Sequence, residues 1–261
     1  MDSITRAETF LRRGPGLNGR SFGRECPTCV VVYSDAILAG ILENATSEAI
    51  DIGCTVPCRL HLLRDGAGRG LCLVRGRPGA PMAAVLLEEL VALGFREFFT
   101  LGPAGHPSLG HGSLAPGDVV LVDRARIHEG TSAHYSPGRS WSRSDPGVTD
   151  RFAHLLGAAG VRYRRGAAAS TDGLYRETPE LIRSLVRDRV LALDMELSAL
   201  FTVAAHHAVP IAAAVYVTDI VSVRLGWQAA FHADGVADTV QGLIRCLRAF
   251  LPGQEAYERC S

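Results

Sequence analysis

Two acidic residues stand at the ends of predicted strands, where a side chain can reach a ligand. Glu196 follows Asp194 at the junction between a predicted strand and a predicted helix, and Asp219 closes the apolar stretch "VPIAAAVYVTD". In an open α/β sheet, ligands bind at the carboxyl ends of the strands, so both carboxylates are candidates for contacting a substrate. Structural explanations are open as well. Asp219 can cap a turn, and Glu196 can be an acid of the first helical turn that the helix dipole favours.

A glycine-rich stretch, "FFTLGPAGHPSLGHG", runs from Phe98 to Gly112. We expect its Gly-Pro-Ala-Gly segment, residues 102–105, to form a tight turn directly after a strand. Such a turn brings backbone N–H groups close to a ligand, often a phosphate. Whether phosphate binds here depends on the side chains around the turn.

The chain contains seven cysteines and no lysine, which limits its chemistry. Without lysine, Schiff-base catalysis, a lysine nucleophile and a Walker-type phosphate site are excluded. Cys26 and Cys29 form a CxxC pair, and Cys54 and Cys58 form a CxxxC pair. Their relative spacing is irregular for a zinc site, so we expect reduced cysteines with a structural role and no metal. A metal or redox role is the alternative.

Composition points to an ordinary globular protein. Of 261 residues, 47% are hydrophobic and 21% are charged, and the formal net charge is zero. A neutral balance gives no electrostatic reason to expect nucleic acid or a membrane as a partner. The first residues, "MDSITRAETFLRRGPG", lack the apolar core of a signal peptide, so we expect a cytoplasmic protein.

Strands and helices alternate along most of the chain. Apolar and β-branched runs predict strands at 29–35, 69–76, 96–102, 117–127, 161–170, 190–196 and 209–219. Apolar residues at helical spacing predict helices at 36–45, 80–94, 150–160, 178–186, 197–208 and 235–251. This order predicts an α/β fold with a mainly parallel or mixed sheet. We place one domain at 29–261 after an N-terminal arm at 1–28, and we predict a polar loop of a site or interface at 134–150.

Five stretches, in order over roughly residues 29–250, resemble the nucleoside phosphorylase family. "GAPMAAVLLEELVALGFREFFTLGPAGH" is similar to the family's "GSPSAAIVLEELIALGAKKFIRVGTAGG", and "IHEGTSAHY" resembles "RDEGTSYHY" of its uridine-phosphorylase branch. "STDGLY" stands where members have "SSDTFY" or "SADLFY", "LDMELSALFTVA" resembles the "EMESA" segment, and "YVTD" resembles the "SD" of purine-cleaving members. The resemblance implies a twisted mixed central sheet flanked by helices, assembled as dimers or hexamers.

The resemblance also implies a reaction, which is cleavage of the N-glycosidic bond of a nucleoside without a cofactor. By position, Met195 and Glu196 would hold the sugar, with the carboxylate of Glu196 on its hydroxyls. A ribosyl group becomes oxocarbenium-like as the bond breaks, and a fixed carboxylate orients and stabilises it. Asp219 would be the general acid that protonates the departing purine ring.

Two sequence features give conflicting predictions about the base of the nucleoside. Pyrimidine-cleaving relatives lack the aspartate at position 219, so Asp219 favours a purine-type base, whereas "EGTSAHY" resembles the uridine branch. We give Asp219 more weight because it would take part in the chemistry. Leu174 stands where the family has a base-stacking aromatic, and we predict that it borders the base together with Thr218 and Gly105. Arg224 is expected to support base protonation or to be a solvated surface arginine.

The residues that bind phosphate in the family are replaced here. Members carry "RVGT" or "RVGS" where this chain has Thr100 and Pro103, and "PGDPLRA" where it has Ser34 and Leu38. A charge-assisted contact is worth about 1.5–3 kcal/mol, so losing two arginines would weaken phosphate binding by orders of magnitude. The resemblance is therefore to a divergent member with an eroded phosphate site.

Three hypotheses follow. In the first, water replaces phosphate as the acceptor, and Asp35 near the end of the first strand activates it, although Asp35 can equally cap the helix at 36–45. In the second, phosphorolysis persists with an anion site rebuilt from Arg75 and Arg77, which are otherwise a solvated strand end. In the third, the fold has been recruited for another reaction or for binding a nucleoside-like ligand.

Overall fold

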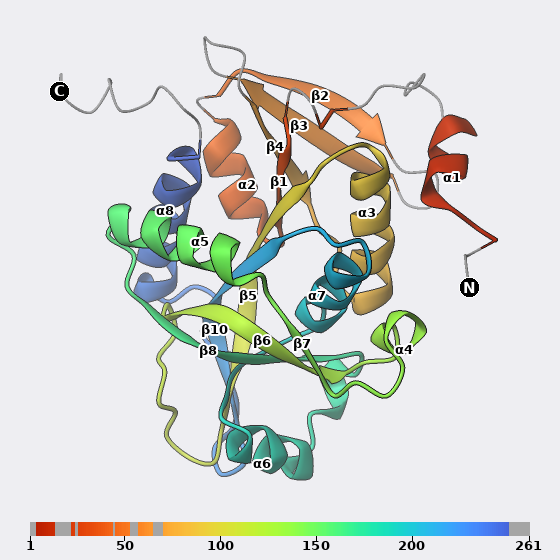
Figure 1. Cartoon of the computed structure of the whole chain (residues 1–261). Coiled ribbons are helices and arrows are strands. Elements are labelled where there is room, and N and C mark those ends of the chain that lie inside the picture. Colours follow the sequence, from red (N-terminus) through yellow and green to blue (C-terminus); the bar gives the residue numbers. More distant parts are fainter. Residues whose placement is uncertain are drawn as a thin grey trace, which may run out of the picture.

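The computed structural model describes residues 4–13, 22–23, 26–43, 45–52, 57–64 and 70–250 (Figure 1). The strands in this part of the chain are β1 (Thr28–Val32), β2 (Ser47–Ile52), β3 (Cys58–Arg64), β4 (Gly70–Arg75), β5 (Glu97–Ser108), β6 (Val119–His128), β7 (Trp141–Arg143), β8 (Tyr163–Thr171), β9 (Val190–Asp194), β10 (Ile211–Ser222) and β11 (Gly226–Ala229). The helices are α1 (Ala7–Arg13), α2 (Asp35–Leu42), α3 (Ala80–Ala92), α4 (Ser132–Tyr135), α5 (Pro146–Ala158), the 3₁₀ helix η1 (Leu174–Arg176), α6 (Pro179–Arg187), α7 (Leu197–His206) and α8 (Asp234–Arg248).

All of these strands belong to one mixed sheet. Their order is β11-β10-β6-β8-β9-β5-β1-β4-β3-β2, with β7 paired to β6. An additional pairing of β10 with β5 closes five strands, β5, β10, β6, β8 and β9, into a ring, from which β1, β4, β3 and β2 extend. The sheet and its flanking helices confirm the predicted α/β class with a mixed central sheet.

Helices cover both faces of the sheet, and the strands between them are apolar on both sides. In β1, Cys29 and Val31 pack into a core beneath α1, α3 and α7. Val30 and Val32 point to the opposite face and pack beneath α2, α5 and α8. Successive strand residues alternate between faces, so a continuous apolar run such as "CVVV" is what a doubly covered strand requires. Figure 1 shows these two helical layers on either side of the sheet.

The expected tight turn at residues 102–105 is wrong. Strand β5 continues unbroken from Glu97 to Ser108, and its Gly102 and Pro103 pair with Val215 and Tyr216 of β10. Proline cannot donate a hydrogen bond within a sheet, so it needs a position where one strand edge is free. Neighbouring β1 pairs with β5 only as far as Leu101, which leaves the edge free at the next residues.

The described parts of the predicted N-terminal arm pack onto the domain. Leu11 of α1 and Phe22 are buried in the core, and the ring of Phe22 stacks on Phe95 with a centroid distance of 6.0 Å. The assignment of residues 1–28 as a separate arm stays a prediction. None of the helices in the described residues is long and apolar enough to cross a membrane.

Candidate active site

Glu196 lies in the short connection between β9 and α7, with its side chain directed into the protein. Its Oε1 accepts a 2.6 Å hydrogen bond from the backbone N–H of Gly79, and its Oε2 accepts one of 3.3 Å from the N–H of Met195. Gly79 precedes α3 with a φ of +105°, a conformation that favours glycine. Only 9% of the surface of Glu196 is exposed. The helix start at α3 therefore fixes the carboxylate that the sequence predicted to hold the sugar.

Asp194, the last residue of β9, holds the connection that carries Glu196. Its Oδ1 accepts a hydrogen bond from the hydroxyl of Ser170 at 2.7 Å. Its Oδ2 accepts the backbone N–H groups of Glu196 at 2.9 Å and Leu197 at 2.7 Å. These N–H groups lie at the start of α7, where a helix has no internal acceptors for its donors. Asp194 thus shapes the connection that carries Glu196, a role that the sequence did not reveal.

A chain of serines and Glu129 extends the network to two more of the motifs. Ser170 accepts the N–H of Ser198 at 2.8 Å, and the Ser198 hydroxyl donates to Oε1 of Glu129 at 2.9 Å. Oε2 of Glu129 accepts the N–H of Ser132 at 3.0 Å. The stretches "IHEGTSAHY", "STDGLY" and "LDMELSALF", which are far apart in the sequence, therefore meet through buried hydrogen bonds.

Burial makes both carboxyl groups weaker acids than usual. Removal from water, together with the nearby charge of Asp194, raises the pKa of Glu196 to about 8, although hydrogen bonds from Gly79 and Met195 oppose the shift. Burial also raises the pKa of Asp194 to about 6, although three hydrogen bonds oppose that shift. Raised pKa values of this kind often occur in carboxyl groups at functional sites.

Asp219 lies in the same region of the sheet, on β10. Across the sheet, Gly105 of β5 pairs with Leu193 of β9 on one side and with Asp219 on the other. The carboxylate accepts the hydroxyl of Thr218 at 3.0 Å and the indole N–H of Trp227 at 2.8 Å. A side chain at Gly105 would meet Oδ2 of Asp219 at 3.0 Å, so this glycine leaves space beside the carboxylate. The structure brings together three of the predicted base and acid residues.

Glu177 is a second carboxyl group close to Asp219 that the sequence did not single out. Burial raises the pKa of Glu177 to about 7, and the negative charge of Asp219 contributes to the shift. Glu177 directly follows η1, in which Leu174 is exposed. Arg224 is also exposed, in the connection after β10, with its side chain beside Gly110. No sequence pattern marks Glu177, because its neighbour is supplied by a distant strand.

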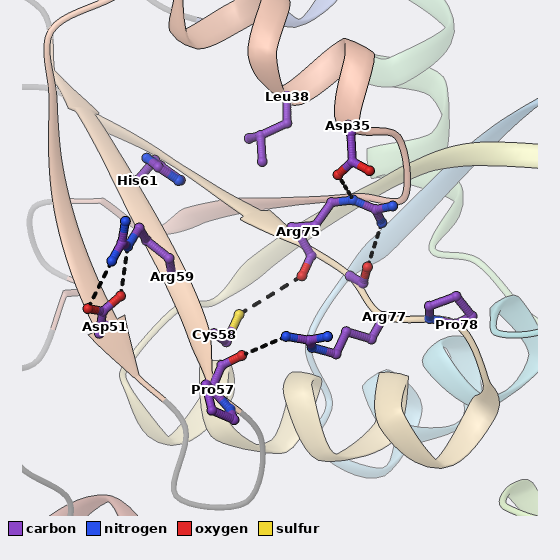
Figure 2. Close-up of a pocket in the computed structure, with 11 residues that line it drawn as sticks. Asp35, Leu38, Asp51, Pro57, Cys58, Arg59, His61, Arg75, Arg77 and Pro78 are labelled. Atoms are coloured by element: carbon purple, nitrogen blue, oxygen red, sulfur yellow. Dashed lines mark hydrogen bonds and ion pairs between the residues drawn. The ribbon is translucent and has the colours of Figure 1, made fainter.

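The region predicted to bind an anion is an open pocket of about 530 Å³ (Figure 2). Arg75 lines it, but its Nε donates to Oδ1 of Asp35 at 2.6 Å and its Nη1 donates to the carbonyl of Gly76 at 2.6 Å. Arg77 donates to the carbonyl of Pro57 at 3.3 Å. The charge of Arg75 is thus already balanced by Asp35, whereas the carbonyl that accepts from Arg77 is neutral.

Asp35 is held by this ion pair and does not cap the helix. The side chain of Ser34 caps α2 by accepting the N–H of Ile37 at 3.3 Å, while Asp35 lies in the first turn. The hydrogen bond and charge of Arg75 lower the pKa of Asp35. Its side chain is 87% exposed. A carboxylate with a lowered pKa is a weak base, which limits what Asp35 can do to a water molecule.

Tyr33 fills the space near the predicted phosphate-binding positions. A side-chain atom at Gly76 would lie 2.5 Å from the Tyr33 ring, and one at Gly102 would lie 2.7 Å from its Cβ. The hydroxyl groups of Tyr33 and Thr100 are buried, and within the described residues neither has a hydrogen-bond partner. Burial raises the pKa of Tyr33, and the negative charges of Glu196 and Asp194 contribute to the shift. The Tyr33 hydroxyl therefore stays protonated.

Two of the described cysteines are neighbours in the sheet, because Cys29 of β1 pairs with Cys72 of β4. Among the described residues, Cys29, Cys58, Cys72 and Cys246 form no disulfide. Cys54, half of the CxxxC pair, lies outside the described residues. Within the described ranges no three histidine, cysteine or acidic residues are grouped as metal ligands would be.

Comparison with known proteins places the chain among relatives of similar fold. Residues 58–252 match the family described as the phosphorylase superfamily. The purine nucleoside phosphorylase from Toxoplasma gondii, solved in complex with immucillin-H, superposes with a TM-score of 0.70 over 85% of this chain and 88% of that one. With 15% sequence identity, this likeness shows the fold alone.

Curated relatives match part of the sequence more closely. The uridine phosphorylase of Thermococcus kodakarensis is 32% identical over 139 residues, covering 48% of this chain and 49% of that protein. The guanosine phosphorylase of Halorubrum lacusprofundi is 31% identical over 131 residues, covering 48% of this chain and 51% of that protein. The chain thus spans about half the length of the curated relatives it matches.

Proposed function

This chain belongs to the phosphorylase superfamily, and we propose that it cleaves the N-glycosidic bond of a purine-type nucleoside. The observation that carries the proposal is the buried carboxylate of Glu196, which Gly79 and Met195 fix with backbone N–H groups. Such a group accepts hydrogen bonds from sugar hydroxyls in a place from which water is largely excluded. We place the sugar against Met195 and Glu196.

Bond cleavage would develop positive charge on the sugar. The anomeric carbon becomes oxocarbenium-like as the base departs, and a negative charge held nearby stabilises this state more than the ground state. Because the Asp194 and Glu196 pair lies within a network of fixed donors, little reorganisation would be needed. In the protein without substrate, the pKa of Glu196 is raised to about 8, so the protonated form predominates at neutral pH. The substrate hydroxyls and the developing positive charge would favour its ionisation.

Asp219 is our candidate for protonating the departing base. It lies across Gly105 from the strand that carries the Glu196 connection, so a nucleoside can extend from one carboxylate to the other. Thr218 and Trp227 hold the carboxylate, and Glu177 beside it has a pKa of about 7. A carboxyl group next to a departing base can protonate it if it lies within hydrogen-bond distance of the base. The curated relatives include a guanosine phosphorylase as well as uridine phosphorylases.

We propose water as the acceptor of the sugar. The ring of Tyr33 fills the space beside Gly76 and Gly102, and Thr100 and Pro103 offer no charge to an anion. Asp35 would orient water rather than deprotonate it, because Arg75 lowers its pKa. An oxocarbenium-like carbon is reactive enough to be captured by a weakly activated water molecule.

Phosphorolysis is the second candidate function. It is favoured by the names of the relatives, which are phosphorylases, and by Arg77, which donates to a backbone carbonyl in an open pocket. A phosphate in that pocket would replace the carbonyl as the partner of Arg77.

One assay distinguishes these functions. The protein is incubated with a panel of purine and pyrimidine nucleosides, with and without phosphate, and the released base and sugar are identified by chromatography. Free base with free sugar supports hydrolysis, and free base with sugar phosphate supports phosphorolysis. Absence of turnover with thermal stabilisation by a nucleoside would contradict both and leave a binding role.

A further inference from the structure

A large aromatic side chain lies exposed next to Asp219. Trp227 belongs to β11, an edge strand whose residues are all exposed, and 61% of the Trp227 surface is accessible. Tryptophan is usually more buried than this in a folded protein. Its position therefore needs an explanation other than packing in the core.

The indole is nevertheless fixed in orientation. Its single donor, Nε1–H, is used in the 2.8 Å hydrogen bond to Oδ2 of Asp219. In the antiparallel pairing of β10 with β11, Trp227 is opposite Val221 and Asp219 is opposite Ala229. Diagonal neighbours of this kind lie on the same face of a sheet. The edge of the ring is thus tied to Asp219, while most of the residue's surface stays accessible to another planar group.

The surroundings suit such a group. Phe231 lies beside the indole with a centroid distance of 6.0 Å, and it is half exposed. On the other side of Asp219, Gly105 contributes no side chain. The exposed faces of Trp227 and Phe231 are uncharged and aromatic, which favours stacking of a flat heterocycle.

We propose that Trp227 is the platform on which the substrate's base stacks, and that its N–H positions Asp219 toward that base. This inference rests on the proposed function and deepens it by assigning the base subsite to β11. A general acid must lie within hydrogen-bond distance of the atom that it protonates. A base that reaches Asp219 therefore lies next to the indole that is bonded to the same carboxylate.

Fluorescence measures the contact directly. The chain has two tryptophans, so Trp141→Phe leaves Trp227 as the sole tryptophan, and Trp227→Phe leaves Trp141 as a matched control. Adenine, guanine, hypoxanthine and uracil are titrated against both variants, with free ribose as the sugar probe. We expect the purine bases to quench Trp227 in a saturable way and to leave Trp141 unaffected. Quenching of neither, or of both equally, would overturn the platform.

Kinetics separate the two roles of the side chain. Trp227→Phe keeps a ring but loses the N–H, so KM for the nucleoside should change little while kcat falls roughly 10- to 100-fold. Trp227→Leu loses both, so KM should also rise roughly 5- to 150-fold, the usual value of one stacked base. A Trp227→Leu protein with the KM of the wild type would overturn the proposal.

Failure of this inference can be told from failure of the proposed function. Nucleoside cleavage that Trp227→Leu leaves unaltered would refute the platform and keep the glycosidic activity. Saturable quenching by purines without cleavage of any nucleoside would refute the activity and keep the platform. Absence of both turnover and quenching would refute the two together.

Discussion

Glu196 and Asp35 each follow the end of a strand, β9 and β1 respectively, yet the protein holds them in opposite ways. Glu196 is 9% exposed and is bound by backbone N–H groups, whereas the side chain of Asp35 is 87% exposed and is bound by Arg75. The pKa of Glu196 is raised to about 8, and the pKa of Asp35 is lowered. One carboxyl group is kept weakly acidic and away from water, while the other is kept ionised in water.

The type of a charged residue does not determine whether its charge is available to a ligand. Arg75 has the charge that an anion site needs, but Asp35 and two backbone carbonyls already accept hydrogen bonds from its Nε and Nη1. In contrast, the Glu196 carboxyl group is held by the backbone N–H groups of Gly79 and Met195, and once ionised it carries its charge without an ion pair among the described residues. A ligand gains more from a fixed and uncompensated charge than from one that has to be released from an ion pair.

The largest expected effect comes from Glu196→Gln, which removes the negative charge with little change in volume. We expect turnover of the true substrate to fall at least about 100-fold, because stabilisation of the oxocarbenium-like state is lost. The measurement is kcat and KM with the released base as readout. Glu180→Gln, an exposed acid of α6, is the matched control and should keep the wild-type rate. Equal rates for the two variants would remove Glu196 from the site.

The next effect compares the stability contributed by two aspartates. Asp194→Ala leaves a buried hydroxyl and two backbone N–H groups without their acceptor, so we expect a loss of about 2–3 kcal/mol. Asp35→Ala breaks an exposed ion pair and should cost less than about 1 kcal/mol. Urea unfolding followed by circular dichroism gives both values. Similar losses for the two variants would show that the burial difference has no energetic consequence.

A pH dependence follows from the raised pKa of Glu196. Between an unfolded pKa near 4.5 and the folded value of about 8, the folded state binds more protons than the unfolded state. The free energy of unfolding should therefore fall as pH rises from about 5 to 8, by at most about 1.4 kcal/mol per pH unit. Glu196→Gln should show a flatter profile over the same range. Parallel profiles for the two proteins would indicate that Glu196 is not protonated in the folded state.

The smallest expected effect is that of phosphate on turnover. Because Arg75 is neutralised by Asp35, we expect millimolar phosphate to change the rate less than about twofold. Rates are measured over a phosphate series at constant ionic strength, for the wild type and for Arg77→Gln. A saturable increase at micromolar phosphate that Arg77→Gln abolishes would establish phosphorolysis in its place.

The sequence predicted the buried elements of this fold well and its edges poorly. Apolar runs such as β1 and β10 carry their own signal, since both faces of these strands are covered. Strands β2, β3 and β11 were not predicted. Strands β2 and β11 lie at the two ends of the sheet order and have few or no buried residues, and β3, next to β2, is fully buried at only three positions. Glycine and proline in β5 suggested a turn, and only the pairing with β10 reveals the strand.

The same distinction applies to the candidate site. Glu196 and Asp219 were singled out as candidates because each follows an apolar run at the end of a predicted strand, and their roles stay predictions. Glu177 and Trp227 were missed because their significance lies in contacts with Asp219, which come from the pairing of strands and not from local spacing. A residue whose partner is set by tertiary structure leaves no pattern in its own neighbourhood.

The hydrogen bond between Gly79 and Glu196 joins residues 117 positions apart in the chain. Closing a segment of this length costs conformational entropy before any contact within it is made. Contacts so remote in sequence form after the local helices and neighbouring strands during folding. A chain that has acquired its helices therefore does not yet have Glu196 fixed by Gly79. Under the proposed function, the capacity to bind a nucleoside would be a late property of the folding chain.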